Sequence, residues 1–378
     1  MRIAVNTRFL LHQRLEGIGT FSHQVLQRLV VQHPEHQFIF MFDRPWHESF
    51  IYADNVIPLA VFPPARHPIL YYWWFEWAIP AAMKKHKADL FFSPDGYLSL
   101  RADLPQIAVI HDLAFEHFPK DVSRMEAAFY RYFFPKYANK SKHILTVSQY
   151  SKSDIEKIYK LPSDKIKVVY NGADTGFGPV EEVAKETSRK TYSQGLPYFL
   201  YVGALHQRKN IVRLLNAFLF FLEENLKDQK PIYPLVIVGR KAWGTAEMDE
   251  VFQSSDLLQK WVSFTGRLDD KELMQVTASA FCHINVSYFE GFGIPVLESL
   301  QSGVPAIVSQ DSALSEVGGN AALTVDPLSI PQITSALHTM QDDPKRYQTL
   351  AANSISQAEK FSWDKTTKLV WEEIERAI

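Results

Sequence analysis

Two glutamates flank a glycine-containing loop in the last third of the chain. Glu290 and Glu298 enclose the stretch Gly291-Phe292-Gly293-Ile294-Pro295-Val296-Leu297, which follows an apolar run at 280–286. Such a run is typical of a buried parallel strand, and Pro295 suits the first turn of a helix because proline needs no amide partner there. The sequence therefore predicts a strand, a loop and a helix N-terminus, with Glu290 before the helix and Glu298 in its first turn.

This loop has the chemistry of a site for a phosphorylated ligand. Its glycines let a ligand approach the backbone, and the amides of Phe292, Gly293 and Ile294 are expected to point out of the helix N-terminus toward an anion. The two carboxylates do not suit phosphate, but their oxygens suit the hydroxyl groups of a ribose and of a sugar. The alternative is an acidic residue placed favourably near a helix dipole, which we favour for Glu298 alone but not for the whole motif.

A pair of cations follows another predicted strand. Arg208 and Lys209 come after the apolar run at 198–202 and before a helix that is predicted by the spacing of apolar residues at 211–222. Positive charge at a helix N-terminus opposes the helix dipole, so a sequence that accepts this cost is expected to use it. We therefore predict that Arg208 and Lys209 bind a diphosphate. A solvated basic pair is the second interpretation.

A histidine and two glycines in the first half are further candidates. His111 ends the predicted strand at 107–111, where open parallel sheets bind their ligands, and Asp112 follows it. The chain has 13 histidines, so this position at a strand end is what distinguishes His111 from the others. Gly17 and Gly19 precede a predicted helix that runs to about residue 31. For these glycines, a loop that faces a ligand and a simple tight turn are equally good interpretations.

An aromatic and basic stretch at 66–87 allows two interpretations. It contains six aromatic residues between positions 71 and 77, and three lysines near its end. Such a segment can lie at a membrane surface, so peripheral membrane contact is one interpretation. We favour a buried helix core instead, because Pro80 argues against one long surface helix. A second aromatic helix, predicted at 125–137, has the same favoured interpretation.

The composition is that of a soluble globular protein with about two domains. The chain has 378 residues, of which 46% are hydrophobic, and its formal net charge of -2 gives no reason to expect nucleic-acid binding. Its single cysteine, Cys282, lies in an apolar run and fits a reducing compartment. Polar residues interrupt the first apolar run at once, so we expect no signal peptide, and no run approaches the ~20 apolar residues of a membrane helix. A cytoplasmic protein is expected, with the inner face of the membrane as an alternative location.

Short β-rich runs alternate with amphipathic segments along the whole chain, which predicts an α/β fold with parallel sheets. The strands expected in the first half are Arg2–Asn6, Gln37–Phe42, Asp89–Ser93, Ile107–His111, His143–Val147 and Lys167–Tyr170. Those expected in the second half are Tyr198–Val202, Leu235–Val238, Val262–Thr265, Ala280–Val286, Ala306–Ser309 and Ala322–Val325. We expect Rossmann-like domains at 1–178 and 179–362, a hinge within 172–195, and a final helix at 363–378 that can pack back on the first domain.

With these pieces in place, nearly the whole chain resembles a GT-B glycosyltransferase of the retaining, nucleotide-sugar-dependent family 4. The most specific element is Glu290 with Glu298, which matches the Glu-x7-Glu signature of that family. The other matching segments are Gly17-Ile18-Gly19, His111-Asp112-Leu113, 147–155, 168–174, Val202-Gly203 with Arg208-Lys209-Asn210, Phe264-Thr265-Gly266-Arg267, Gly303-Val304-Pro305 and Glu316-Val317. One departure is Ala204, where many relatives have an arginine; this variant resembles the mannosyltransferase-like and rhamnosyltransferase-like branch.

The resemblance implies two domains that face a cleft, with the nucleotide sugar in the second. It implies that Glu290 and the amides at 292 and 293 contact the donor sugar and its phosphates, and that Glu298 holds the ribose. Arg208 and Lys209 neutralise the leaving diphosphate, and His111 faces the transferring sugar. The residues expected to bind the donor are Gly17, Gly19, Gly266, Arg267, Gly291, Phe292, Gly293, Ile294, Leu297 and Glu298, with Gly266 and Arg267 near the base.

We therefore expect an enzyme that moves a sugar from a nucleoside diphosphate to an acceptor hydroxyl with retention of configuration. GDP-mannose or a similar compound is the candidate donor, and a glycan, a lipid-linked molecule or a small molecule is the acceptor. No metal and no further cofactor is expected, because the cations and the helix amides act on the leaving group. The alternatives are a nucleotide-sugar epimerase with the same architecture and a two-lobed sugar-binding protein.

Overall fold

The protein folds into two compact units. The computed structural model describes residues 1–12, 15–241 and 246–378. The first unit comprises Met1–Asn171 together with Ser362–Ile378, and the second comprises Gly172–Phe361. The first unit thus ends earlier than the boundary expected at residue 178, and the end of the chain returns to it.

A seven-stranded parallel sheet forms the centre of the first unit. The strand order is β3-β2-β1-β4-β5-β6-β7. The strands are β1 (Arg2–Asn6), β2 (Gln37–Phe42), β3 (Val56–Ala60), β4 (Leu90–Ser93), β5 (Gln106–Val109), β6 (His143–Thr146) and β7 (Ile166–Val168). Sequence patterns did not predict β3, whose central residue is Pro58. Proline cannot donate to a neighbouring strand, and β3 tolerates it because it lies at the edge of the sheet.

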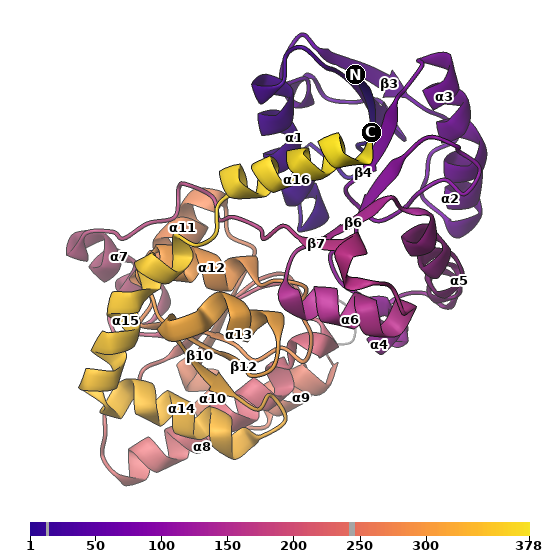
Figure 1. Cartoon of the computed structure of the whole chain (residues 1–378). Helices are drawn as coiled ribbons and strands as arrows, with labels where there is room; N and C mark the ends of the chain where they lie inside the picture. Colours follow the sequence, from indigo (N-terminus) through magenta and orange to yellow (C-terminus); the bar gives the residue numbers. More distant parts are fainter. Residues whose placement is uncertain (13–14, 242–245) are drawn as a thin grey trace. The chain divides into compact units, whose positions relative to one another are not determined.

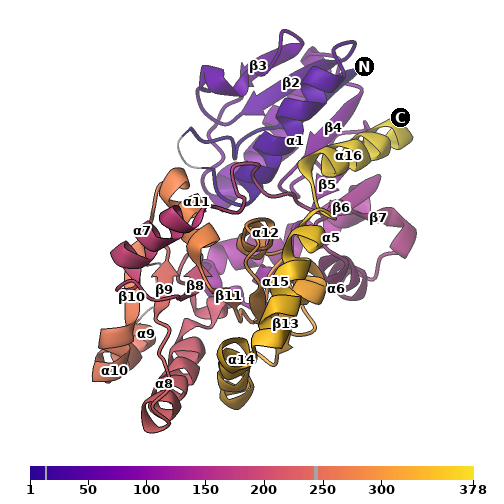
Figure 2. The same ribbon diagram turned by 90° about the vertical axis from the view of Figure 1, so that its left-hand side faces the viewer.

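Helices cover this sheet, and the last helix of the chain is one of them. Helices α1 and α16 lie side by side (Figure 1, Figure 2), where Phe21 of α1 meets Trp363 of α16 at 6.1 Å between ring centroids. The α-helices are α1 (Ile18–Gln32), α2 (Pro68–Trp73), α3 (Ile79–Lys85), α4 (Ala114–His117), α5 (Arg124–Lys140), α6 (Gln149–Tyr159) and α16 (Trp363–Ala377). Single turns are η1 (Glu48–Phe50), η3 (Pro119–Asp121) and η4 (Ser163–Lys165).

The aromatic stretch departs from its predicted structure. Helical backbone runs from α2 through a π-helical segment, η2 (Trp74–Ala78), directly into α3. Pro80 lies in the first turn of α3, and the amide of Ile79 donates to the carbonyl of Trp74, five residues earlier. The wider π turn accommodates the proline, so Pro80 does not end the helical run as expected.

A six-stranded parallel sheet forms the centre of the second unit, with the order β10-β9-β8-β11-β12-β13. Its strands are β8 (Phe199–Val202), β9 (Leu235–Val238), β10 (Val262–Gly266), β11 (Cys282–Asn285), β12 (Ala306–Ser309) and β13 (Ala322–Val325). Strand β11 is shorter than the predicted run at 280–286, because Ala280 caps the preceding helix and is buried there. An apolar residue in the sequence indicates burial, but it does not show whether that residue ends a helix or begins a strand.

The helices of the second unit pack against both its sheet and one another; α8 and α14, for example, lie side by side (Figure 1, Figure 2). They are α7 (Glu182–Tyr192), α8 (Ile211–Lys227), α9 (Ala246–Gln253), α10 (Asp256–Trp261), α11 (Asp270–Ser279), α12 (Ile294–Gln301), α13 (Ala313–Gly318), α14 (Ile330–Asp342) and α15 (Pro344–Ala358). Single turns are η5 (Gln207–Lys209) and η6 (Gly319–Ala321). The stretch at 172–195, expected as a hinge, contains α7, which packs on α11.

Each sheet has one point where the strand order reverses. In the first unit the chain builds outward from β1 to β3 and then crosses back to β4, so the reversal lies between β1 and β4. In the second unit it lies between β8 and β11. Ligands of open α/β sheets bind beyond the carboxyl ends of the strands at these points. The segments that follow β1, β4, β8 and β11 are therefore expected to carry the residues that bind a ligand.

Candidate active site

The loops after β8 and β11 meet through an ionic cluster centred on Glu290. Arg208 Nη1 lies 3.2 Å from Glu290 Oε2 and donates to the carbonyl of Phe289 at 2.8 Å. Lys209 Nζ pairs with the other oxygen, Glu290 Oε1, which also accepts a hydrogen bond from Ser287 Oγ at 3.0 Å. The structure thus brings together three residues that the sequence predicted separately, at the reversal point of the second sheet.

Glu290 is ionised at every physiological pH. Burial raises the pKa of its carboxyl group, but Lys209 and Arg208 outweigh this effect and hold the pKa at about 2. Two cations face one carboxylate, so the cluster keeps an excess positive charge. The side chains of Arg208 and Lys209 remain 21% and 15% exposed, which leaves both within reach of a ligand.

Asn210 ties these loops together, although its role was not recognised in the sequence. It adopts the left-handed conformation (φ 61°) between η5 and α8, which asparagine tolerates better than most residues. Its Nδ2 donates to the carbonyls of Val286 at 2.9 Å and Pro327 at 2.7 Å. The amide of Tyr288 in turn donates to the carbonyl of Arg208 at 2.9 Å. The Arg208 backbone is therefore fixed against the segment that carries Glu290.

The N-terminus of α12 is the second part of the site. Its cap, Gly293, has φ 110°, and a Cβ atom there would lie 2.5 Å from Leu314 Cδ2, so only glycine fits. The amides of Val296 and Leu297 donate to the carbonyl of Gly293. The amides of Gly293 and Ile294, by contrast, have no hydrogen-bond partner among the residues that the structure describes. This arrangement suits a phosphate oxygen.

The neighbouring loop residues Gly291 and Phe292 are buried, and the ring of Phe292 meets that of Phe361 at 5.6 Å. This contact anchors the loop between β11 and α12. Phe292 therefore contributes packing to the site in addition to the backbone role that was predicted for it.

Glu298 lies in the second turn of α12, not in the first turn as predicted. A carboxylate there gains little from the helix dipole, which weakens the dipole interpretation of this residue. No side chain or amide in the described ranges donates a hydrogen bond to its carboxyl group. Burial raises the pKa of Glu298 to about 8, and the carboxylates of Asp174 and Asp270 contribute to the rise. The half-buried carboxyl group receives no hydrogen bond from the described residues, and hydroxyl groups of a ligand that donate to it would favour its ionised form.

Gly266 and Arg267 lie at the carboxyl end of β10, the outermost strand on that side, with β9 between them and β8. Gly266 has φ 73°, and its carbonyl accepts the amide of Gly239 at 2.9 Å. Arg267 is exposed. The structure therefore does not bring these two residues into the ionic cluster, and their predicted place near a base stays a prediction. Among the described residues, no three His, Cys, Asp or Glu side chains gather as metal ligands do.

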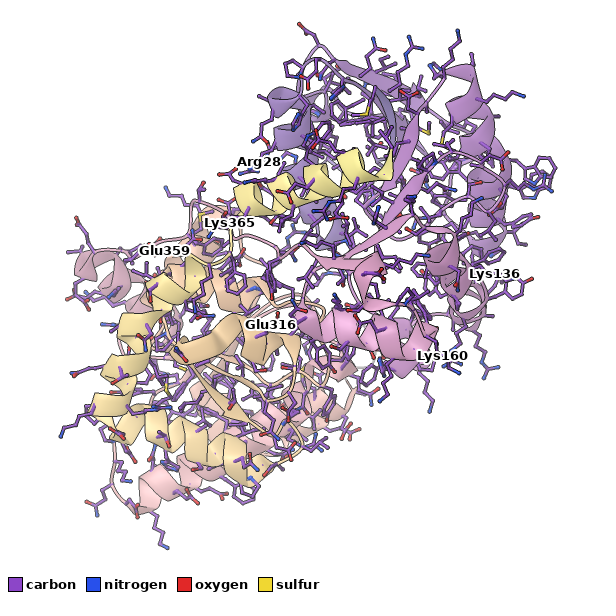
Figure 3. The ribbon with its side chains drawn as sticks, viewed as in Figure 1. Arg28, Lys136, Lys160, Glu316, Glu359 and Lys365 are labelled. Carbon is purple, nitrogen blue, oxygen red and sulfur yellow. The ribbon has the colours of Figure 1, made fainter. Side chains whose placement is uncertain are left out.

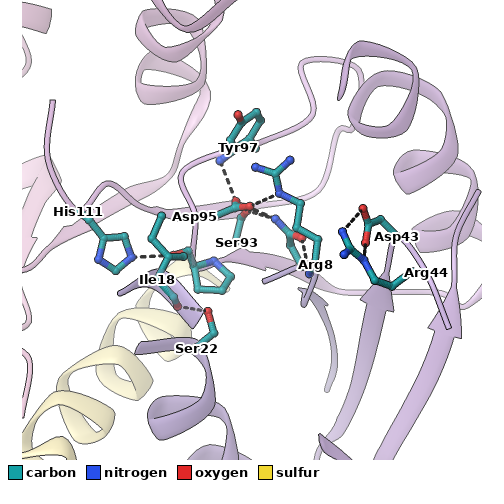
Figure 4. Close-up of polar contacts among 11 residues, drawn as sticks. Arg8, Ile18, Ser22, Asp43, Arg44, Ser93, Asp95, Tyr97 and His111 are labelled. Atoms are coloured by element: carbon teal, nitrogen blue, oxygen red, sulfur yellow. Dashed lines mark hydrogen bonds and ion pairs between the residues drawn. The ribbon is translucent and has the colours of Figure 1, made fainter. Parts of the chain in front are cut away.

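In the first unit, His111 follows β5 and is held against the segment after β4 (Figure 4). Its Nε2 bonds the carbonyl of Pro94 at 2.8 Å. A carbonyl can only accept, so Nε2 carries the proton and Nδ1 keeps a lone pair while the ring is neutral. Burial lowers the pKa of His111 below its ordinary value, although the Pro94 carbonyl and Asp112 act in the opposite direction. Neutral His111 thus presents one hydrogen-bond acceptor.

The start of α1 lies beside this histidine. The ring of Phe21 meets that of His111 edge-on at 5.0 Å, and Figure 4 shows the hydrogen bond from Ser22 Oγ to the carbonyl of Ile18 in the same helix. Gly17 caps the helix with φ 34°, and a Cβ atom on Gly19 would lie 2.7 Å from the carbonyl oxygen of Phe9. Both glycines are therefore needed by the backbone itself, so a structural role accounts for them.

A buried ion pair, which the sequence analysis missed, occupies the reversal point of the first sheet (Figure 4). Arg8 Nε, after β1, lies 2.6 Å from Asp95 Oδ2, after β4. Asn6 Nδ2 donates to Asp95 Oδ1 at 2.7 Å, and the guanidinium of Arg8 lies over the ring of Tyr97 at 4.1 Å. Asp95 follows Pro94, whose carbonyl holds His111, so the ion pair fixes the segment that positions the histidine. In the sequence, an arginine two residues after a predicted buried strand could have indicated this pair.

We predict that replacing Glu298 with glutamine stabilises the folded protein increasingly as pH rises. The raised pKa means that the folded protein keeps a proton that the unfolded chain releases, so Glu298 costs stability progressively from its unfolded pKa up to about pH 8. Urea unfolding at about pH 5 and about pH 8 should show a gain for Glu298→Gln that is larger by about 1–3 kcal/mol at the higher pH. The exposed Glu223→Gln variant is the control. Equal pH dependence in wild type and Glu298→Gln would contradict the assigned environment.

Comparison with known protein families agrees with this geometry. The model of Glycosyltransferase Family 4 matches residues 15–177, and that of Glycosyl transferases group 1 matches residues 184–357. Two curated relatives are O-antigen chain mannosyltransferase B of Escherichia coli and O-antigen chain mannosyltransferase RfbU of Salmonella typhimurium. The first is 29% identical over 376 residues, covering 93% of this chain and 94% of the relative. The second is 28% identical over 302 residues, covering 79% of each chain.

Solved structures agree on the fold. Anabaena HepE, determined with UDP-glucose, superposes with a TM-score of 0.75 over 100% of both chains at 16% identity. Sucrose-phosphate synthase from Thermosynechococcus elongatus superposes with a TM-score of 0.75 over 100% of this chain and 98% of that one, at 15% identity. The chain has two parallel-sheet units, two adjacent family matches and a curated relative of nearly the same length. It therefore belongs to glycosyltransferase family 4 and has the GT-B fold.

Proposed function

We propose that this glycosyltransferase transfers a sugar from a nucleoside diphosphate sugar to an acceptor hydroxyl in polysaccharide assembly. The observation that carries the proposal is the composition of the reversal point in the second sheet. Arg208 and Lys209 stand there with a net positive charge, and the amides of Gly293 and Ile294 are unpartnered among the described residues. Glu298 nearby is a hydrogen-bond acceptor without donors. A diphosphate and a ribose together match these groups.

The proposal divides the binding between two kinds of group. The cations and amides neutralise the charge that grows on the departing diphosphate, while Glu298 accepts the ribose hydroxyls. Glu290 stays ionised and can accept hydroxyls of the donor sugar while it holds the two cations in place. In this proposal the leaving group needs no metal ion, because positive charge is already fixed beside it.

Retention of the anomeric configuration is also part of the proposal. A same-face attack assisted by the leaving diphosphate needs no enzyme nucleophile, and the ion-paired Glu290 is poorly suited to be one, since its charge is already shared by two cations. His111 is proposed to orient the transferring sugar or the acceptor through its Nδ1 lone pair.

The names of the relatives suggest the substrate class. Both curated relatives are O-antigen chain mannosyltransferases, so GDP-mannose and a growing polysaccharide are the proposed donor and acceptor. The solved structure of HepE contains UDP-glucose, which makes UDP-glucose the comparison donor. The epimerase alternative gains no support from these matches, and a sugar-binding protein would not require the paired cations.

We predict that a panel of nucleoside diphosphate sugars, incubated with the purified protein and a mannan acceptor, yields transfer or slow donor hydrolysis with GDP-mannose. Activity should persist in EDTA, because Arg208 and Lys209 supply the charge on the leaving group. Proton NMR of the product should show the anomeric configuration of the donor. An isomerised donor would support the epimerase instead, and loss of activity in EDTA that magnesium restores would remove the metal-free proposal.

Removing either cation is expected to weaken diphosphate binding. Lys209→Met and Arg208→Met each delete a charged contact worth roughly 1.5–3 kcal/mol, so the affinity for GDP should fall about ten- to a hundredfold while the affinity for guanosine changes little. Calorimetry on both ligands measures this difference. Lys227→Met, at the exposed end of α8, is the matched control. Unchanged GDP affinity in both variants would show that Arg208 and Lys209 do not bind the diphosphate and only support the structure.

His111 should affect turnover but not nucleotide affinity. His111→Ala is expected to lower kcat about tenfold or more, whereas GDP binding should stay at the wild-type value. The wild-type rate should also fall as pH drops and His111 gains a proton, because the Nδ1 lone pair is then lost. His111→Gln can still donate to the Pro94 carbonyl and offers its amide oxygen as an acceptor, but it cannot gain a proton. Turnover of this variant should therefore not fall at low pH, and a fall equal to that of the wild type would show that His111 is not the titrating group.

A further inference from the structure

The helical run from α2 to α3 turns a row of large apolar side chains outward. Ile69, Tyr72, Trp73 and Trp77 are between 37% and 60% exposed, and their spacing keeps them along one side of the helix. The opposite side of the run is buried, through Pro68, Tyr71, Trp74, Phe75, Ile79 and Met83. The interpretation of this stretch as a buried helix core is therefore correct for one side of the run and wrong for the other. Packing within the unit accounts for the buried side, but not for the exposed aromatic row.

Helix α5 extends this row. Tyr132 and Met125 are 59% and 49% exposed, and the ring of Tyr72 lies 5.9 Å from that of Phe133, between the two helices. Figure 1 shows α2, α3 and α5 along the same side of the first unit. We name the exposed apolar side chains of these helices the aromatic surface. Its members are Ile69, Tyr72, Trp73, Trp77, Met125 and Tyr132.

Positive charge is concentrated in the two chain segments that carry the aromatic surface. Residues 66–87 and 124–142 together hold nine arginines and lysines but only two acidic residues. Of these two, Glu76 is buried and accepts the amide of Leu100 at 3.1 Å, and Glu126 caps the start of α5. Two cations lie directly on the rings: the Arg101 guanidinium is 3.6 Å from the ring centre of Trp77, and Lys136 Nζ is 3.2 Å from that of Tyr132. Lys136 projects outward from α5 (Figure 3). The chain as a whole is slightly negative, so this concentration is local.

We propose that the aromatic surface docks the protein on the headgroup region of an anionic lipid bilayer. Tryptophan and tyrosine favour the membrane interface because their rings are apolar and their N–H and O–H groups are polar. Arginine and lysine bury their stems while their charges contact anionic headgroups. No helix in the described ranges is long and apolar enough to cross a membrane. Docking through the headgroups is a peripheral contact.

Two other occupants fit less well. A nucleic acid offers negative charge, but it gives no reason to expose Ile69 and Met125. A second copy of this chain would bring two cationic surfaces together, and like charges across an interface disfavour association. Bilayer docking does not depend on the proposed function, and only its consequence, access to a lipid-linked acceptor, rests on that function.

The test is sedimentation of the full-length protein with lipid vesicles, without any donor. Vesicles that contain phosphatidylglycerol should bind the wild-type protein, and pure phosphatidylcholine vesicles should bind it at least tenfold more weakly. High salt should release it, because the headgroup attraction is screened. Quenching of tryptophan fluorescence by lipids brominated near the headgroup should accompany binding.

Two independent variants test the surface. Trp73→Ser with Trp77→Ser removes exposed rings, and Lys84→Glu with Lys136→Glu reverses charge without touching the core. Each pair should weaken vesicle binding at least tenfold, while the melting temperature and GDP affinity stay at wild-type values. Phe220→Ser, on the exposed side of α8 in the second unit, is the matched control and should bind vesicles normally.

Three results would overturn the proposal. The first is wild-type vesicle binding by both variants. The second is equal binding to neutral and anionic vesicles. The third is binding to RNA, or formation of a dimer, that depends on the same tryptophans while anionic vesicles do not bind. Because no donor is present, a failure here is distinguishable from a failure of the proposed transferase activity.

Discussion

The ion cluster of Glu290, Lys209 and Arg208 is the interaction on which the proposed donor site depends. A buried carboxylate is stable only with charge partners, and breaking a buried pair costs about 3–5 kcal/mol. Here the partners come from the loop after β8 and the carboxylate comes from the loop after β11. These strands are neighbours in the sheet although about eighty residues separate them in sequence. The cluster thus fixes the two loops against each other, and in the proposed function its cations contact the diphosphate of the donor.

The ion pairs at the reversal points of the two sheets differ in charge balance and in exposure. Each carries a carboxylate and an arginine at its reversal point: Arg8 with Asp95 in the first unit, and Arg208 with Glu290 in the second. In the first pair one arginine faces one carboxylate, and the arginine lies against the ring of Tyr97. This pair stabilises the segment whose Pro94 carbonyl holds His111. The second pair has an additional cation and remains partly exposed. This difference in charge balance separates a structural ion pair from one that is available to a ligand.

Sequence reasoning predicted the family and the central strands, and it singled out Arg208, Lys209 and Glu290, which the structure gathers into one ionic cluster, because strong patterns mark them. Buried parallel strands are continuous apolar runs, and the Glu290–Glu298 motif combines several unusual residues. It missed β3, whose Pro58 is tolerable only at a sheet edge, and it missed the Arg8–Asp95 pair, whose partners are distant in sequence. It also could not decide which face of an aromatic helix is buried when both faces are apolar. Trp74 and Trp77 differ only in what the tertiary fold places beside them.

The most direct test of the donor site is a crystal structure of the full-length protein with bound GDP. We predict diphosphate oxygens within hydrogen-bond distance of the amides of Gly293 and Ile294 and of the Lys209 and Arg208 side chains. The ribose hydroxyls should donate to Glu298. A diphosphate bound away from α12, with Lys209 and Arg208 still paired with Glu290 and making no contact with the ligand, would contradict this account.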